Sequence, residues 1–400
     1  MSNLLEWRKE FPVLERTLYL NSCSLGAVPR SVPESQKRFY DLWATQGTKA
    51  WESWFSDLMD LRRDIATFIG AEFRETAITY SVAAAMTSVA SALDFKGKRN
   101  KVVFSECEFP SSAHVWQKWE GLGAKVEIVP ARKDGQSVDL EAWKKAIDKK
   151  TLIVPTSHVF FRSGCIQDAK ALAEICHDAG ALFFLDDYQS LGIVPHDLHD
   201  IGCDFATGGL LKWCCGGPGV VMFYASDEML RKYEPRAMGW LATKDPFAFK
   251  LRGWEHAPDA WRFTYGTPPV AAAYTTRPGF DIIRKIGVPE IKERVDGLST
   301  HFAKRALAEG WKLFSPVDAS KRSGIVTFDF PKSQEVCSVL LDRDVIVDHR
   351  PGAGIRVSPH FYNTREELDR FVDEVNRARQ DLKSGKVKAK SPHPMESHGD

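Results

Sequence analysis

The sequence has almost no excess charge: 54 Lys and Arg residues face 53 Asp and Glu residues, which leaves a formal net charge of +1. Such a balance gives no electrostatic basis for binding a nucleic acid or an acidic membrane surface. No apolar run approaches the ~20 residues that span a bilayer. The N-terminal stretch MSNLLEWRKEFPVLER also lacks the apolar segment of a signal peptide. We therefore expect a soluble, cytoplasmic protein.

Cysteine is also scarce, with 8 residues in 400 and no pair at the C-x-x-C spacing. In a chain of this length, scattered cysteines indicate reduced, buried thiols rather than a disulfide framework. The segment HDLHD, from His196 to Asp200, invites a metal-site interpretation, but no Cys or Glu cluster accompanies it. We therefore expect no metal site.

The pattern of apolar runs predicts an α/β fold. From Thr76 onward, short β-rich runs alternate with helical patterns, which is typical of βαβ units in a mostly parallel sheet. The length suits one large and one small domain. We expect an N-terminal arm (1–20), a large domain (21–268), a linking helix with a small α+β domain (269–385), and a disordered tail (386–400).

Two sequence signals mark helix boundaries in the C-terminal part of the chain. Gly287-Val288-Pro289 predicts an interruption in the long helical stretch that starts at Pro269. Thr364, with Glu367 three residues later, is the signature of a capping box and predicts the start of the last helix.

The most informative stretch joins a buried strand to a lysine. Leu182–Leu185 is apolar and ends in two acids, Asp186 and Asp187, and Lys212 follows between two apolar residues before a Gly-rich turn. A carboxylate and an amine in such places both carry a desolvation cost. Pyridoxal 5'-phosphate (PLP) chemistry uses both groups. From these residues alone, a surface lysine and an acid that caps a strand remain an alternative.

The ordered motifs SHVFFRSG, DDYQSLG, GCDF, LKW and GGPG resemble the class V aminotransferase family of fold-type I PLP enzymes, over about residues 15–385. The chain is most similar to its kynureninase, isopenicillin-epimerase-like and cysteine desulfurase members. The resemblance implies a large domain with a mostly parallel seven-stranded sheet and a small C-terminal α+β domain. It also implies an α-amino acid substrate and a homodimer with shared active sites.

The resemblance assigns the central roles to three residues. Lys212 would hold PLP as a Schiff base and then move the proton of the substrate Cα. Asp186 would keep the pyridine nitrogen protonated, and Gln189 would hydrogen-bond the phenolic oxygen of the cofactor. Asp187 is the competing candidate for the acid at the ring nitrogen.

Other residues would contact the cofactor from the sheet edge. A strand–helix junction offers backbone N–H groups and a helix dipole for an anion, and in the family this junction binds the PLP phosphate. It consists here of Ser81, Val82 and Ala83. Phe109, in an F-P motif, would stack on the cofactor ring. Ser111 or Ser112 would reach the substrate or the phosphate.

The remaining cofactor candidates come from three further motifs. Ser157 and His158 form the S-H-V motif at a strand end, and we rank His158 low because such histidines are often core residues. Trp240, in MGW, and Thr267, in YGTPP, resemble segments that reach the phosphate from the neighbouring subunit.

Arg356, in GIRVSPHFYNT, resembles the family's arginine that binds the substrate α-carboxylate, a role that suits the planar guanidinium. Arg350 is a second candidate for this wall of the site.

Two departures from the family pattern bear on the reaction. Leu211 stands where kynureninases carry a tyrosine and desulfurases a histidine. Residues 350–354 contain no cysteine, whereas desulfurases need a nucleophilic one before the carboxylate-binding arginine. We therefore expect a kynureninase-like lyase that cleaves a C–C or C–S bond of the side chain, slightly ahead of an aminotransferase. An epimerase follows, and a non-catalytic PLP-binding protein is the alternative from another class.

Overall fold

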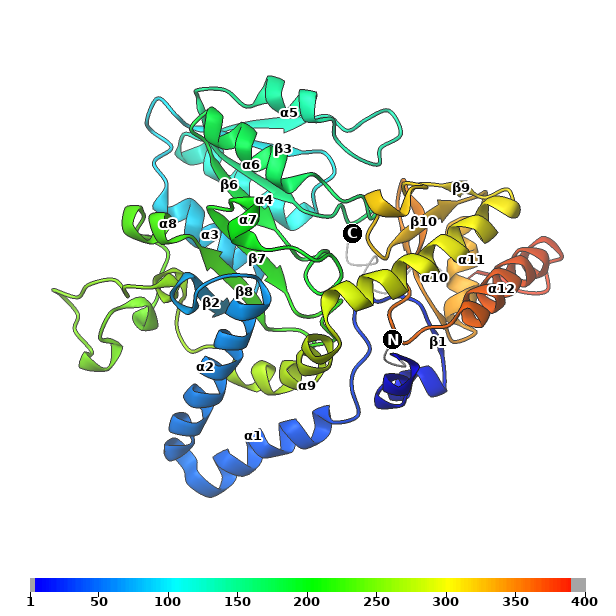
Figure 1. Cartoon of the computed structure of the whole chain (residues 1–400), viewed down its shortest axis with the longest axis horizontal. Helices are drawn as coiled ribbons and strands as arrows, with labels where there is room; N and C mark the ends of the chain where they lie inside the picture. Colours follow the sequence, from blue (N-terminus) through cyan, green and yellow to red (C-terminus); the bar gives the residue numbers. More distant parts are fainter. Residues whose placement is uncertain (1–3, 390–400) are drawn as a thin grey trace.

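The computed structural model describes residues 4–389, which form a large α/β body and a smaller α+β body joined by long helices (Figure 1). Residues 390–400 of the predicted disordered tail lie outside the described residues. Within the described part of the chain, no helix is both long enough and apolar enough to cross a membrane.

The large body is organised on a seven-stranded sheet, with strand order β2-β8-β7-β6-β5-β3-β4. Strand β8 runs opposite to the other six strands, which are parallel to one another, so the prediction of a mostly parallel sheet is confirmed. The strands are β2 (Thr76–Thr79), β3 (Lys101–Ser105), β4 (Lys125–Val129), β5 (Thr151–Ser157), β6 (Leu182–Asp186), β7 (Phe205–Gly209) and β8 (Val221–Ala225).

Helices cover both faces of this sheet, and alternation along β6 shows how the two faces are built. Phe183 and Leu185 pack into the core under one set of helices, whereas Leu182 and Phe184 pack under the other. Burial on both faces explains the continuous apolar runs of the inner strands. The first set is α2 (Ala50–Phe68), α5 (Leu140–Ala146), α6 (Ala169–Asp178) and α7 (Leu198–Ile201). The second set is α3 (Val82–Ala92), α4 (Pro110–Lys118) and α8 (Asp227–Lys232).

The smaller body is an antiparallel four-stranded sheet with the order β12-β13-β10-β9, covered by helices. Phe302, Phe328 and Phe371 pack together at its centre. Its elements are β9 (Lys312–Leu313), β10 (Val326–Asp329), α11 (Ser333–Leu341), β12 (Asp348–Arg350), β13 (Gly354–Val357) and α12 (Arg365–Lys383). Thr364 and Glu367 form the predicted capping box at the start of α12.

Long helices and the N-terminal segment connect the two bodies. Helices α9 (Val270–Ile286) and α10 (Val288–Ala308) are separated at Gly287, as predicted, where φ is +94°. Helix α1 (Val32–Gln46) packs against α9. Near the N-terminus, β1 (Leu18–Tyr19) pairs with β11 (Val345–Ile346), so the start of the chain is anchored beside the smaller body.

Candidate active site

A cavity of about 450 Å³ opens where β5 and β6 end, and most of the predicted site residues line it. Ligands of open α/β sheets bind at this carboxyl edge. The predicted residues on its wall are Ser81, Val82, Ala83, Phe109, Ser111, Ser157, Asp186, Gln189, Lys212, Arg350 and Arg356. The structure therefore brings together residues that are up to 275 positions apart in the sequence, from Ser81 to Arg356.

Lys212 lies in the turn between β7 and β8, and backbone hydrogen bonds fix the residues around it. Gly26 N–H donates to the Leu211 carbonyl at 3.0 Å, and Cys215 N–H donates to the Lys212 carbonyl at 3.0 Å. The Lys212 amine lies 4.4 Å from the centre of the Tyr188 ring. Burial, followed by the charge of Arg356, lowers its pKa to about 8. About one tenth of the amine is therefore neutral at pH 7 and able to attack a carbonyl, far more than for a lysine with the ordinary pKa of 10.5.

Asp186 is the last residue of β6 and is 6% exposed, with its carboxylate on the cavity wall. Its Oδ1 accepts one hydrogen bond from the Tyr188 N–H at 3.0 Å. Burial raises its pKa to about 7, and the nearby Glu108 carboxylate adds to the rise. Burial deprives the ionised carboxylate of water. A cationic N–H placed against it would replace that solvation and so strongly stabilise the ionised form.

Glu108, which is not among the predicted site residues, organises the wall beside Asp186. Its carboxylate accepts hydrogen bonds from the hydroxyls of Ser105 and Thr156, both at 2.7 Å. It also accepts from the Ser157 N–H at 2.9 Å and the Ser157 hydroxyl at 2.6 Å. Ser157 therefore lies on the cavity wall with its hydroxyl oriented by Glu108.

The predicted anion-binding junction lies at the start of α3. Ser81 is the N-cap residue, and its hydroxyl oxygen accepts the Ala84 N–H at 3.1 Å. The first N–H groups of a helix have no acceptor within the helix, and here they belong to Val82 and Ala83. This eleven-residue helix can therefore offer backbone donors and its dipole to a phosphate.

Phe109 and Gln189 complete the wall for a flat ring. The Phe109 side chain is 44% exposed, and its ring meets Phe161 edge-on with the ring centres 5.2 Å apart. The Gln189 amide donates to the Cys23 carbonyl at 2.9 Å and accepts the Trp213 indole N–H at 3.2 Å. These two bonds leave one Gln189 N–H for a further acceptor.

Arg356 is 1% exposed and is already held by two partners. Its Nε and Nη2 donate to Asp348 at 2.7 and 2.5 Å, and its Nη1 donates to the Phe161 carbonyl at 2.7 Å. A guanidinium has five N–H groups, so one on each Nη remains for a substrate carboxylate. Arg350 also contacts Asp348, at 2.9 Å, and lines the same cavity.

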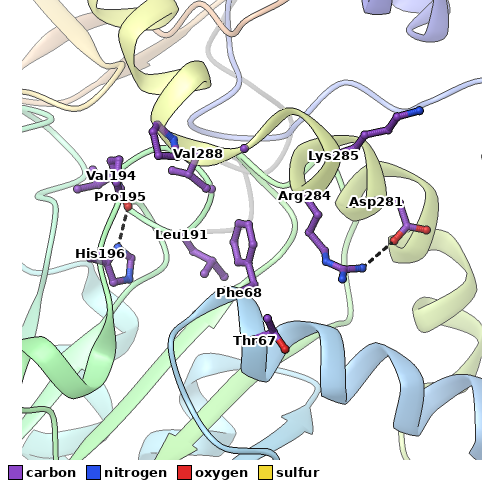
Figure 2. Close-up of a pocket in the computed structure, with 13 residues that line it drawn as sticks. Thr67, Phe68, Leu191, Val194, Pro195, His196, Asp281, Arg284, Lys285 and Val288 are labelled. Carbon is purple, nitrogen blue, oxygen red and sulfur yellow. Dashed lines mark hydrogen bonds and ion pairs between the residues drawn. The ribbon is translucent and has the colours of Figure 1, made fainter.

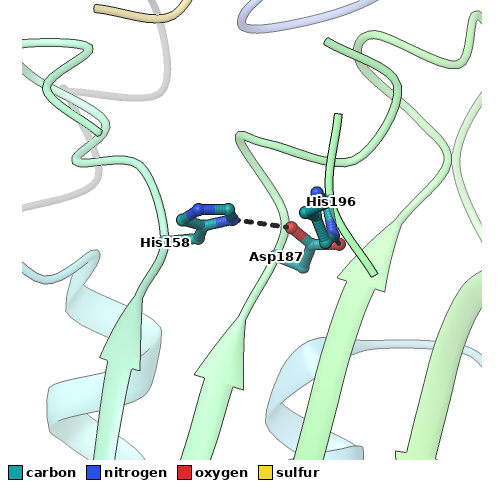
Figure 3. A group of neighbouring side chains, drawn as sticks. All are labelled: His158, Asp187 and His196. Atoms are coloured by element: carbon teal, nitrogen blue, oxygen red, sulfur yellow. Dashed lines mark hydrogen bonds and ion pairs between the residues drawn. The ribbon is translucent and has the colours of Figure 1, made fainter. Parts of the chain in front are cut away.

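Several candidates lie away from this cavity. Asp187 is completely buried and contacts His158 and His196 on the other side of the strand end, so the competing acid does not face the cavity (Figure 3). Trp240 is 42% exposed and stacks on Phe249. Thr267 lies at a separate surface depression lined also by Trp43, Trp51 and Trp54.

The HDLHD segment does not converge on one point. His196 pairs with Asp187, and His199 pairs with Glu75 at 2.6 Å. Asp197 instead caps α7 through the N–H groups of His199 and Asp200. The side chains of the segment therefore have separate partners, and His196 belongs to a cluster with His158 and Asp187.

Cys23 and Tyr188 are further residues of the cavity wall that sequence reasoning did not select as site residues. Tyr188 lies between Asp186 and Gln189 in the sequence, so its proximity could have been inferred from the motif itself. Cys23 comes from the N-terminal segment. Burial raises the pKa of its thiol, which keeps it protonated and a weak nucleophile.

The residues present fit PLP. An anionic group would meet the free amides of α3, a flat ring would meet the open face of Phe109, and an aldehyde would meet the buried amine of Lys212. The pyridine nitrogen would supply the cationic N–H that the buried Asp186 carboxylate favours.

Relatives named for several enzymes cover nearly the whole chain. Uncharacterized aminotransferase YcbU of Bacillus subtilis strain 168 is 32% identical over 370 residues, which cover 92% of this chain and 96% of that protein. A kynureninase of Pseudomonas fluorescens is 28% identical, with 87% of this chain and 85% of the relative covered. The solved apo cysteine desulfurase of Thermococcus onnurineus NA1 has a TM-score of 0.84 at 24% identity and covers 95% of this chain and 98% of that one.

The solved structures share the fold of this chain, and its family is shown by the match of its sequence to a family model. The family model described as "Aminotransferase class-V" matches residues 18–371. This match includes the cavity, its lysine and both arginines. The chain therefore belongs to the class V aminotransferase family of PLP-dependent enzymes.

Proposed function

We propose that this protein is a lyase that cleaves a C–C or C–S bond in the side chain of an α-amino acid. The observation that carries the proposal is the cavity itself, which combines a partly neutral buried lysine, two arginines and an aromatic wall. Bound PLP supplies an electron sink for the electron pair left when a bond to Cα is broken.

The residues of this chain would divide the work as follows. The remaining N–H groups of Arg356 would bind the substrate carboxylate, with Arg350 beside it. Lys212 would accept and return the proton at Cα, since its pKa of about 8 lies close to neutral pH. Asp186 would hold the ring nitrogen protonated. Phe109 and Phe161 would exclude water and pack against a bulky side chain.

Names of relatives and the chemistry of the thiols support a lyase. Several relatives are kynureninases, and one solved structure that shares the fold is described as a cystine C–S lyase. Persulfide chemistry needs a reactive thiolate, but the only cysteine of this cavity wall, among the described residues, is the protonated Cys23. Residues 350–354 add no cysteine.

Transamination is the second candidate, because the relative at 32% identity is named as an aminotransferase. One experiment separates the two reactions. The purified protein with PLP is incubated with a panel of amino acids, with and without an α-keto acid. Ammonia or a shortened product without the keto acid supports a lyase, whereas conversion of the keto acid into a new amino acid supports an aminotransferase. Lys212→Ala should abolish both turnover and the borohydride-reducible attachment of PLP.

We also propose a homodimer in which Trp240 and Thr267 complete the phosphate site of the neighbouring subunit. Both residues are exposed and lie away from the cavity of their own subunit, which supports a role in trans. Mixing the inactive variants Lys212→Ala and Thr267→Val should restore up to about a quarter of wild-type activity if sites are shared. No recovery in a verified mixed dimer would contradict this arrangement.

All eight cysteines are free, buried thiols, which supports the proposal of a cytoplasmic location.

A further inference from the structure

Three side chains behind the cofactor cavity form a buried cluster that the proposed reaction does not use: His158, Asp187 and His196 (Figure 3). The two oxygens of Asp187 face different histidines. Oδ2 lies 2.8 Å from His196 Nε2, and Oδ1 lies 3.6 Å from His158 Nδ1. The Ser190 hydroxyl also donates to Oδ1. The Asp187 side chain is 0% exposed.

Geometry determines the charge of His196. Its Nδ1 lies 2.7 Å from the Val194 carbonyl (Figure 2). Its Nε2 lies 2.8 Å from the Asp187 carboxylate. Both neighbours are acceptors, so both ring nitrogens must carry a proton. Burial opposes this charge, but the Asp187 carboxylate outweighs burial and raises the pKa of His196. His158 is neutral, because burial lowers its pKa.

The same distances favour a charged hydrogen-bond cluster over a metal centre. Two ligands of a tetrahedral zinc ion, each about 2.0–2.1 Å from it, lie about 3.3 Å apart. The 2.8 Å between Asp187 Oδ2 and His196 Nε2 is instead the length of a charge-assisted hydrogen bond. A proton therefore occupies the position between these two atoms.

This ion pair is directly connected to the acid of the cofactor site. Asp187 follows Asp186, and the backbone holds both residues in the sheet edge. The Asp186 carbonyl accepts the His158 N–H at 2.9 Å, and the Asp187 N–H donates to the Thr207 carbonyl at 2.7 Å. A second negative charge one residue away disfavours ionisation of Asp186 unless that charge is balanced.

We propose that His196 is a positioning residue that neutralises Asp187 and thereby allows Asp186 to remain ionised beside the PLP ring nitrogen. This proposal rests on the role of Asp186 in the proposed function. His196 does not line the cofactor cavity; it lines a second cavity of about 660 Å³ near the start of α10 (Figure 2). There, Arg284 is paired with Asp64 and Asp281. Substituting His196 therefore leaves the wall of the cofactor cavity intact.

Three variants test the charge balance, with the affinity of the apo-protein for PLP as the readout. His196→Gln can still donate to Asp187 but carries no charge, so we expect PLP affinity to fall about 10-fold or more. Asp187→Asn removes the negative charge itself, so affinity should stay within about 3-fold of the wild type. The double variant should recover most of the loss, because neither charge remains. His199→Gln, which breaks the pair with Glu75 nearby, is the control and should bind PLP normally.

A packing role would give a different pattern, and urea unfolding of each variant monitors it. Equal losses of affinity in His196→Gln and Asp187→Asn, or losses that add in the double variant, would overturn the proposal. So would unchanged affinity in His196→Gln, or one equivalent of zinc bound by the wild type and lost in that variant. Failure of the proposed function is distinguishable, because the wild type itself would then form no reducible attachment between PLP and Lys212.

Discussion

Replacing Asp186 by Asn should stabilise the apo-protein while it weakens PLP binding. The rise of the Asp186 pKa from 3.8 to about 7 means that the folded apo-protein disfavours the ionised acid by about 4 kcal/mol, at 1.36 kcal/mol per pH unit. Asn has a similar shape and can still accept the Tyr188 N–H. It removes the buried charge, however, and with it the proposed partner of the pyridine nitrogen.

The pH dependence follows from the direction of the pKa shift. Between pH 3.8 and about 7 the folded wild type binds more protons at Asp186 than the unfolded chain does, so its stability falls as pH rises through this window. From pH about 5.5 to about 8.5, the wild-type apo-protein should lose about 2 kcal/mol more stability than Asp186→Asn does. Titrations that are common to both proteins cancel in this comparison.

Urea unfolding of both apo-proteins at the two pH values, followed by far-UV circular dichroism, measures this difference. A PLP titration of the same samples measures affinity, which should fall at least about 10-fold in the variant. If Asp186→Asn shows the same pH dependence of stability as the wild type, the acid carries no desolvation cost in the cavity. If the variant also binds PLP as tightly as the wild type, the assignment of Asp186 to the ring nitrogen is wrong.

Three further predictions concern other residues. Because burial and Arg356 lower the pKa of Lys212 to about 8, the rate of PLP capture by the apo-protein should rise with pH up to about 8 and then level off in stopped-flow absorbance measurements. Arg356→Lys keeps a cation for Asp348 but loses the paired N–H groups of the planar guanidinium. KM for the amino-acid substrate should therefore rise about 10-fold or more, with a smaller change in kcat. Thr364→Ala should lower the free energy of unfolding by about 1 kcal/mol through loss of the capping box, whereas Thr364→Ser should remain close to the wild type in urea denaturation.

The sequence could predict the parts of this protein that depend on local pattern. Apolar runs of strand length predict the strands of the sheet. Gly287 predicts the break between α9 and α10, and Thr364 predicts the start of α12. Lys212 and Asp186 could be predicted as site residues because each occurs in a distinctive motif beside a strand. Their convergence on one cavity follows from the parallel sheet, which places its strand ends at the same edge.

Residues whose roles depend on distant partners could not be predicted in this way. Glu108 gains its role from the hydroxyls of Thr156 and Ser157, which are brought beside it only by the pairing of β3 with β5. Asp348 matters because the antiparallel pairing of β12 with β13 places it opposite Arg356. Glu108 stands between Cys107 and Phe109, and Asp348 follows the apolar run 345–347, but neither setting indicates these distant partners.

The two adjacent acids show how strand geometry can give neighbouring residues opposite properties. Side chains alternate between the faces of a strand, so Asp186 continues the face of Leu182 and Phe184, and Asp187 continues that of Phe183 and Leu185. On one face, burial raises the pKa of Asp186 in a cavity that can accept a cation. On the other, the charge of His196 outweighs burial and lowers the pKa of Asp187. A shift of one residue in register would exchange these environments, so the pairing of Ser157 with Asp186 is what places Asp186, and not Asp187, at the cavity.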